Sequence, residues 1–208
     1  MALGIPQDLQ EKIWSGHYGP EDIQRIEDLV DQGILDYSTL ASVLYSYASH
    51  LEAAGDRKGH DTYLIKAVAV SDMGAHQLVT AEQYDVRQTI LRDAGRYEDA
   101  KEVIDEGLKI DAPIHTKALL MVGKADALSH LGDTDGARTI MSDVAAGVDD
   151  VVATEPRQAI RIYRALVRFY KKSGNEAAMN EMVQKAYALI LKTGANDQRA
   201  KLEYDMNH

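Results

Sequence analysis

The chain has 208 residues, of which 45% are apolar and 27% charged, and its formal net charge is −10. This composition is typical of a soluble globular protein, long enough for one sizeable domain or one short repeat array. The absence of cysteine excludes disulfides, zinc–thiolate sites and thiol catalysis, and the acidic balance disfavours general attraction to nucleic acid or anionic lipid. The first residues lack the pattern of a secretory signal and no apolar run is long enough for a bilayer, so we expect a cytoplasmic protein without membrane contact.

Apolar residues recur at helical spacing along almost the whole chain, and runs that alternate apolar and polar residues are nearly absent. The pattern therefore predicts an all-α protein. Two short helices are expected first, over residues 6–16 and 20–33, with Pro20 suited to a first helical turn. We expect residues 1–36 to form an N-terminal helical cap.

Four similar breaks follow, each with a glycine after an amphipathic helix: Gly55, Gly95, Gly132 and Gly174. Glycine is favoured there because the residue after a helix often adopts the left-handed conformation. In three of the breaks the next residue is a good N-cap for another helix, namely Asp56, Asp133 or Asn175. The glycines are 40, 37 and 42 residues apart, which predicts a repeat of two helices per unit and hence an α-solenoid.

The second unit contains "AGRYEDAKEVIDEGLKIDAP", residues 94–113. This segment resembles the turn and second helix of a tetratricopeptide repeat (TPR), because its small and apolar residues fall at that family's offsets: Gly95, Tyr97, Ala100, Ile104 and Leu108. The units are longer than the family's period of about 34 residues, and Arg87 and Gln88 stand where the pattern has apolar residues. The resemblance covers residues 37–193 in outline and implies a right-handed α-solenoid of about four TPR-like helical hairpins. Residues 194–208 are expected to form a C-terminal helix or tail.

The segment "RIYRALVRFYKK", residues 161–172, has five basic residues and no acidic one. We expect its helix to start after Thr154 as N-cap, with Pro156 in the first turn. Basic residues at spacings of 4, 3, 4 and 3 then share one face, opposite a face of Ile, Tyr, Leu and Val. This basic stripe consists of Arg157, Arg161, Arg164, Arg168, Lys171 and the adjacent Lys172.

The TPR resemblance implies that Arg161, Arg164, Arg168 and Lys171 line a concave groove that holds a peptide. Arginine forms paired hydrogen bonds with carboxylate or phosphate, so the stripe favours a partner with acidic groups. Two alternatives stay open: the stripe is a solvated helix face, or its arginines pair with acids of neighbouring helices such as Glu176 or Glu181. In the first unit, Tyr45 is the best candidate for an exposed aromatic anchor.

Other motifs are weak. "DTDG", residues 133–136, has the opening of a calcium loop but lacks its remaining ligands, so we assign it to the turn between helices. We interpret "GVDDVVATEP", residues 147–156, as a loop with adjacent acids. The histidines show no metal-binding spacing, and there is no nucleotide-binding signature, so no metal or cofactor is expected.

The function favoured is a protein–protein interaction scaffold or adaptor that binds a partner segment in its concave face. One alternative is a ligand- or peptide-responsive regulatory module acting through a partner, and another is a homo-oligomeric structural protein. An enzyme ranks last. Its site would lie near the N-terminal helices, among Trp14, His17, Tyr18 and Asp22, so we expect the protein not to be an enzyme.

Overall fold

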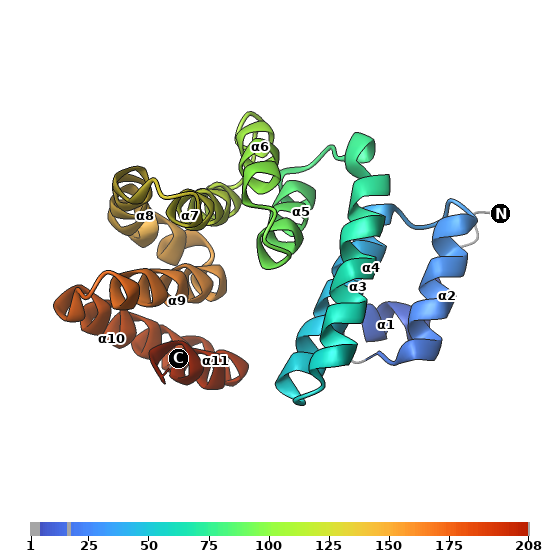
Figure 1. Cartoon of the computed structure of the whole chain (residues 1–208). Helices are drawn as coiled ribbons and strands as arrows, with labels where there is room; N and C mark the ends of the chain where they lie inside the picture. Colours follow the sequence, from blue (N-terminus) through green and yellow to red (C-terminus); the bar gives the residue numbers. More distant parts are fainter. Residues whose placement is uncertain (1–4, 16–17, 208) are drawn as a thin grey trace. The chain divides into compact units, whose positions relative to one another are not determined.

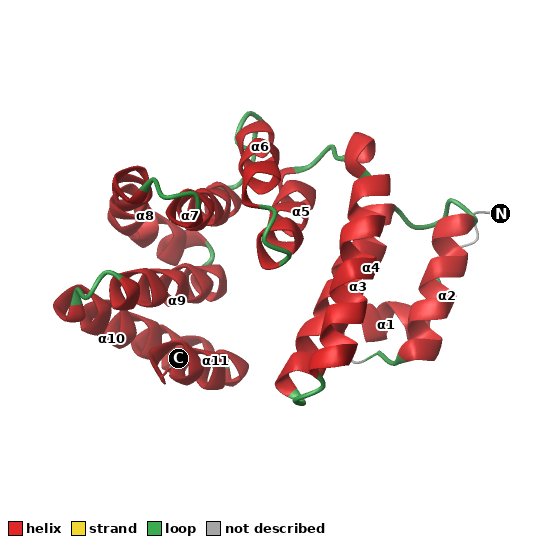
Figure 2. Cartoon of the chain, in the orientation of Figure 1, coloured by secondary structure: helices red, strands yellow, loops and turns green. Residues whose placement is uncertain are grey.

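A computed structural model describes residues 5–15 and 18–207 of the chain (Figure 1). Within these ranges it contains helices, turns and loops but no strand (Figure 2), which confirms the all-α prediction. The chain divides into two compact units, Met1–Val103 and Ile104–His208, and the division falls inside one helix, α6 (Tyr97–Gly107).

In its described residues, the first unit holds five complete helices and the start of α6: α1 (Gln7–Ser15), α2 (Pro20–Asp31), α3 (Tyr37–Ala53), α4 (Arg57–Met73) and α5 (Ala81–Asp93). A short 3₁₀ turn at Ala75–Gln77 precedes α5. Helices α3 and α4 form an antiparallel hairpin with α2 and α5 packed against it. The core includes Leu9 of α1, Ile26 of α2 and Leu44 of α3, all fully buried.

The second unit, as far as residue 207, holds five complete helices besides the end of α6: α7 (Ile114–His130), α8 (Thr134–Thr154), α9 (Pro156–Lys172), α10 (Glu176–Thr193) and α11 (Asn196–Asn207). Helices α7 and α8 form one hairpin, and α9 and α10 form the next. The last helix, α11, packs on both α9 and α10. Apolar residues from all five helices form one continuous core, which ends at Leu202 of α11.

The glycine turns are as the sequence predicts. Gly55, Gly95, Gly132 and Gly174 have φ values of +82°, +75°, +91° and +69°, all in the left-handed region. After three of them the predicted N-cap side chain accepts a backbone N–H three residues on, in the pairs Asp56–Gly59, Asp133–Gly136 and Asn175–Ala178. The predicted organisation into helical hairpins is therefore confirmed, and "DTDG" is one of these turns.

Two expectations near α9 are wrong. Residues 147–154 are not a loop but the last two turns of α8, because Val144, Val148 and Val151 continue its buried face. The helix ends at Thr154 because the residue before a proline is disfavoured in helical geometry. The N-cap of α9 is consequently Glu155 rather than Thr154, and it makes no side-chain capping bond.

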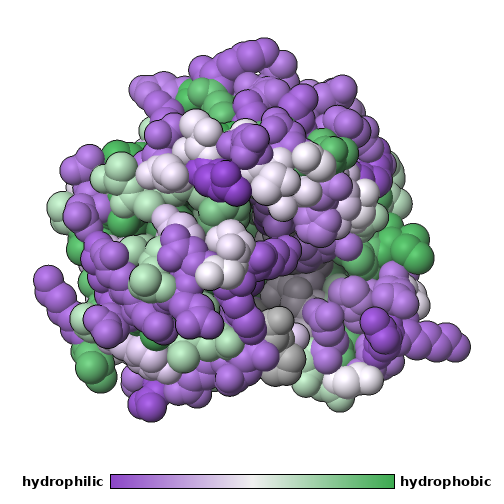
Figure 3. Space-filling model, turned by 60° about the vertical axis from the view of Figure 1, so that its left-hand side comes forward, coloured by the Kyte–Doolittle hydropathy of each residue, from purple (hydrophilic) through white to green (hydrophobic). Residues whose placement is uncertain are grey.

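Both hydrophilic residues and single large apolar residues, such as Ile65 and Leu191, are exposed. On the face drawn in Figure 3, hydrophilic residues separate the coloured hydrophobic ones into small groups. None of the helices in the described ranges has the length and apolar character that crossing a membrane requires.

Candidate functional site

The basic stripe lies on α9, which the sequence makes sharply two-faced. Seven residues of its apolar side are buried against the rest of the second unit: Ala159, Ile160, Ile162, Tyr163, Ala165, Leu166 and Val167. These residues pack against α8, α10 and α7. Burial of this face fixes the rotation of α9, so the basic side chains emerge on the opposite side, where α11 crosses part of the stripe.

The centre of the stripe holds a buried carboxylate. Arg164 Nε donates to Asp205 Oδ2 at 2.7 Å, and Arg168 Nη1 donates to Asp205 Oδ1 at 2.9 Å. The Asp205 side chain is only 5% exposed, against 17% for Arg164 and 49% for Arg168. We call these three residues the Asp205 clamp. The clamp joins the middle of α9 to the last turn of α11.

Further contacts hold α11 on the stripe. Arg164 Nη1 donates to Gln198 Oε1 at 3.2 Å, and Lys171 Nζ donates to the backbone carbonyl of Met206 at 2.9 Å. Leu202, between these positions on α11, is fully buried in the core. A cation on a carbonyl near a helix C-terminus is favourable because that end of the helix dipole is negative.

Burial and neighbouring charges have opposing effects on the pKa of Arg164. Burial lowers the pKa of its guanidinium, the hydrogen bond and charge of Asp205 raise it, and the charges of Arg168 and Arg161 lower it further. The net effect is a pKa below the usual value for arginine, although a guanidinium stays charged in proteins. Arg164 therefore depends on Asp205 as its counter-ion.

The rest of the stripe lies at the surface. The side chains of Arg157, Arg161 and Lys172 are exposed. Arg161 Nη1 donates to Gln158 Oε1 at 3.1 Å, and Lys172 Nζ lies 4.0 Å from Asp126 Oδ1. The stripe thus has two parts: Arg164, Arg168 and Lys171 contact α11, and Arg157, Arg161 and Lys172 face outward.

The acid that pairs with the stripe is not the one that the sequence suggested. Glu181, one of the two acids considered, pairs instead with Lys185 of its own helix at 2.9 Å. Asp205 lies 37 residues from Arg168 and 41 from Arg164 along the chain. The available signal was Leu202 and Asp205, three residues apart on a helix with few apolar residues.

Tyr45 lies in the first unit, between α3 and α5. Its side chain is half-buried, and its hydroxyl donates to the Asp93 carboxylate at the end of α5. Burial raises the pKa of the Tyr45 hydroxyl, and the negative charge of Asp93 raises it further. In this position the ring connects two helices, with its polar atom already bonded.

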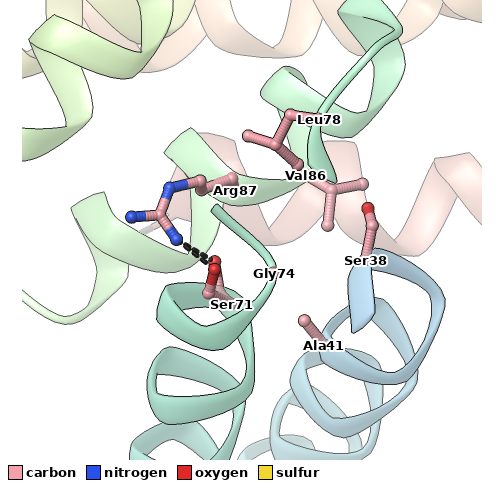
Figure 4. A pocket seen from close by; sticks show the side chains of 7 residues that line it. All are labelled: Ser38, Ala41, Ser71, Gly74, Leu78, Val86 and Arg87. Carbon is pink, nitrogen blue, oxygen red and sulfur yellow. Dashed lines mark hydrogen bonds between the residues drawn. The ribbon is translucent and has the colours of Figure 1, made fainter. Parts of the chain in front are cut away.

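Arg87 lines a small cavity in the first unit, between the end of α4 and the start of α3 (Figure 4). Arg87, where the TPR pattern has an apolar residue, points toward the end of α4 and donates to the carbonyl and hydroxyl of Ser71. Its Nη2 also donates to Asp72 Oδ1 at 3.0 Å. Because its guanidinium closes the C-terminal end of α4, we assign Arg87 a structural role.

Two residues of the enzyme hypothesis, Asp22 and Tyr18, contact neighbouring helices. Asp22 accepts Lys12 Nζ at 2.7 Å and the backbone N–H of Gly19 at 3.1 Å, so it joins α1 to α2 and caps α2. The ring of Tyr18 packs at 6.5 Å from that of Tyr47. Trp14 lies in α1, and His17 lies outside the described residues. The described residues also contain no group of three potential metal ligands.

Comparison with known proteins gives little beyond the fold. No family profile matches the chain, and no curated protein matches it. Among solved structures, it is similar to a kinesin light chain-like protein of Podosopora anserina with nearly identical TPR-like repeats, at 15% identity over 89% of this chain and 92% of that one, with a TM-score of 0.46. A variant of the same protein matches at 15% identity over 90% and 93%, with a TM-score of 0.49.

Proposed function

We propose that this TPR-like protein is an interaction scaffold that binds an acidic segment of a partner protein along the outward part of the basic stripe. The observation that carries the proposal is α9 itself, a helix with six basic residues and no acidic one in a chain of net charge −10. Four of the six have exposed side chains, Arg157, Arg161, Arg168 and Lys172, and Arg168 is the one of these that binds Asp205 of α11. A local patch of this kind attracts acidic groups that the whole molecule would repel.

The arrangement carries a cost that folding alone does not require. Arg157 lies in the first turn of α9, where the positive end of the helix dipole disfavours a cation. Arg157 and Arg161 are also four residues apart, a spacing at which like charges repel by a few tenths of a kcal/mol. A neutral or acidic residue at 157 would favour the helix more, which supports a role for this arginine in binding.

The test reverses charge at two exposed residues of the outward part of the stripe. We expect the double variant Arg157→Glu, Arg161→Glu to lose the partner, because it replaces two exposed guanidinium groups with carboxylates. The measurement is a pull-down from native lysate read by mass spectrometry, with helicity checked by circular dichroism. The supporting result is a protein captured by the unaltered chain, released by salt and lost with the variant.

The matched control is the double variant Arg57→Glu, Lys58→Glu. It changes net charge by the same amount at two exposed positions in the first turn of α4, and glutamate is well tolerated near a helix N-terminus. Equal loss of the partner in both variants would mean that net charge decides, and equal capture by all three chains would reject the stripe as the site.

A second candidate is a peptide-responsive regulatory module that acts through its partner. The observation in its favour is that α11 already covers half of the stripe. Hydrogen exchange that changes in α11 on adding the captured partner would support this reading, and exchange that changes only around Arg157 and Arg161 would support a passive scaffold.

A further inference from the structure

Helix α11 is held by a small apolar contact, in which Leu202 is fully buried and Met206 is partly buried against the core, and by polar contacts such as those of Asp205. Its only buried residues are Leu202 and Asp205, whereas α10 buries five apolar residues in the same unit: Met182, Val183, Ala186, Leu189 and Ile190. Local opening begins where few apolar contacts hold an element. On this comparison, we expect α11 to open more readily than α10.

The charges of α11 also complement the basic face of α9 only in part. The helix contains three acids and two bases, Asp197, Glu203 and Asp205 against Arg199 and Lys201, so its net charge is −1. The face of α9 beneath it carries only positive charge. A segment with the same contacts but without the two basic residues would complement the stripe better.

We propose that the surface of α9 and α10 beneath α11 is a binding site for an acidic helix of a partner protein, and that α11 is its internal occupant until the partner displaces it. This extends the proposed function, since it adds the covered part of the stripe to the outward part. The geometry of α11 defines what the partner helix must present.

Three contacts of α11 describe that helix. A leucine enters the core, as Leu202 does, and a carboxylate three residues later lies between Arg164 and Arg168, as Asp205 does. Residues three apart share one helix face, so the pattern is Leu-x-x-Asp. The helix ends shortly afterwards, because Lys171 binds a carbonyl of its last turn, as it does that of Met206. Acids N-terminal to the leucine would extend toward Arg161 and Arg157.

The connection to α10 permits the exchange. Gly194 separates the two helices with a φ of +67°, and it is preceded directly by the last residue of α10, Thr193. Rotation about this glycine can move α11 without a change in the helical backbone of α10. It withdraws from the core Leu202 and also Ala195, which lies between Gly194 and α11 and is 3% exposed.

The probe is a labelled peptide of residues 194–207, added to the full chain. Two chain variants release α11 by different means: Asp205→Lys places a cation against the two arginines, and Leu202→Ala removes the apolar anchor. We expect both variants to bind the peptide at least tenfold more tightly than the unaltered chain, in which α11 competes. The control peptide with Asp205→Lys should show no binding to either variant. Fluorescence anisotropy measures the affinity, and hydrogen exchange of α11 reports its release.

Two results would overturn the proposal. In the first, the amides of α11 exchange freely in both variants, but the peptide binds to neither. In the second, the amides of α11 stay protected from exchange in both variants. The outcome is separable from that of the scaffold test. Peptide binding together with partner capture that is independent of Arg157 and Arg161 would reject the outward site and retain the covered one.

Discussion

Asp72 in the first unit and Asp205 in the second each accept hydrogen bonds from two arginines. Asp72 binds Arg87 at 3.0 Å and Arg96 at 2.7 Å, and we call these three residues the Asp72 clamp. The distances in the Asp205 clamp are nearly the same, at 2.7 and 2.9 Å. The two carboxylates differ in burial, because the Asp72 side chain is 42% exposed and that of Asp205 is 5% exposed.

The difference shows that similar ion-pair geometry can have unlike energetic weight. At Asp72 water reaches the carboxylate and also Arg96, which is 38% exposed. Arg87 is only 11% exposed, but without the carboxylate it still donates to the carbonyl and hydroxyl of Ser71. At Asp205 the loss would leave Arg164 in a site with little water, and an unpaired buried charge is costly. The clamps also differ in what they join. Asp72 connects α4 to the adjacent α5 and the start of α6, whereas Asp205 connects α9 to a helix with one other buried residue.

The largest expected effect comes from removing each carboxylate. We expect Asp205→Ala to lower the free energy of unfolding of the second unit by about 3 kcal/mol, because breaking a buried pair leaves an uncompensated cation. Asp72→Ala should cost about 1 kcal/mol, the scale of a partly exposed network. Urea unfolding followed by circular dichroism measures both.

Hydrogen exchange provides the control for the two substitutions Asp205→Ala and Asp72→Ala. With Asp205→Ala the loss of protection should be concentrated in α11, because α11 can detach while α9 and α10 keep their apolar core. Equal destabilisation by the two substitutions would show that burial of the carboxylate does not decide the cost.

The two arginines within the Asp205 clamp should also differ. Arg164 is 17% exposed and Arg168 is 49% exposed, so we expect a double-mutant cycle of Arg164→Met with Asp205→Ala to give a coupling of about 2 kcal/mol. The same cycle with Arg168→Met should give less than about 1 kcal/mol. A larger coupling for Arg168 would contradict the argument from burial.

The local elements could be predicted from the sequence because their signals are local. The left-handed glycines, such as Gly132, and the N-caps, such as Asp133, act within a few residues. The Asp205 clamp could not be found in this way, because its partners are distant in sequence and α11 has a single buried apolar residue. The adjacent acids Asp149 and Asp150 led to the prediction of a loop where α8 continues to Thr154. The valines at 144, 148 and 151 nevertheless keep helical spacing.

Family patterns were informative where they failed. Arg87 departs from the TPR pattern because its guanidinium binds the end of α4. The same lesson applies to the basic stripe, where the sequence predicted the shared face correctly but not that α11 would cover part of it. Periodicity determines which residues share a face, but only packing determines what that face contacts.

Acid should weaken the Asp72 clamp before the chain unfolds. Burial raises the pKa of Asp72, but hydrogen bonds from Arg96 and Arg87 outweigh it, so the pKa lies below its usual value. The stabilisation is therefore complete above the ordinary value of about 3.9 and lost as the pH falls through the lowered one. We expect the stability difference between the unaltered chain and Asp72→Asn to be constant from pH 7 to 5 and to shrink below about pH 4, as measured by urea unfolding.

Salt should produce the smallest effect and the clearest contrast. Raising NaCl from 0.05 to 1 M shortens the screening length from more than 10 Å to about 3 Å, and screening acts on charges that solvent ions can approach. The cost of Asp72→Ala should therefore fall by about 0.5 kcal/mol, whereas that of Asp205→Ala should stay within error, since its carboxylate and Arg164 are both mostly buried. Urea titrations of both variants at the two salt concentrations measure this. An equal decrease in the cost of both substitutions would mean that ions reach the Asp205 clamp. Ions can reach it only if α11 opens in the folded protein. Displacement of α11 by a partner helix requires the same motion.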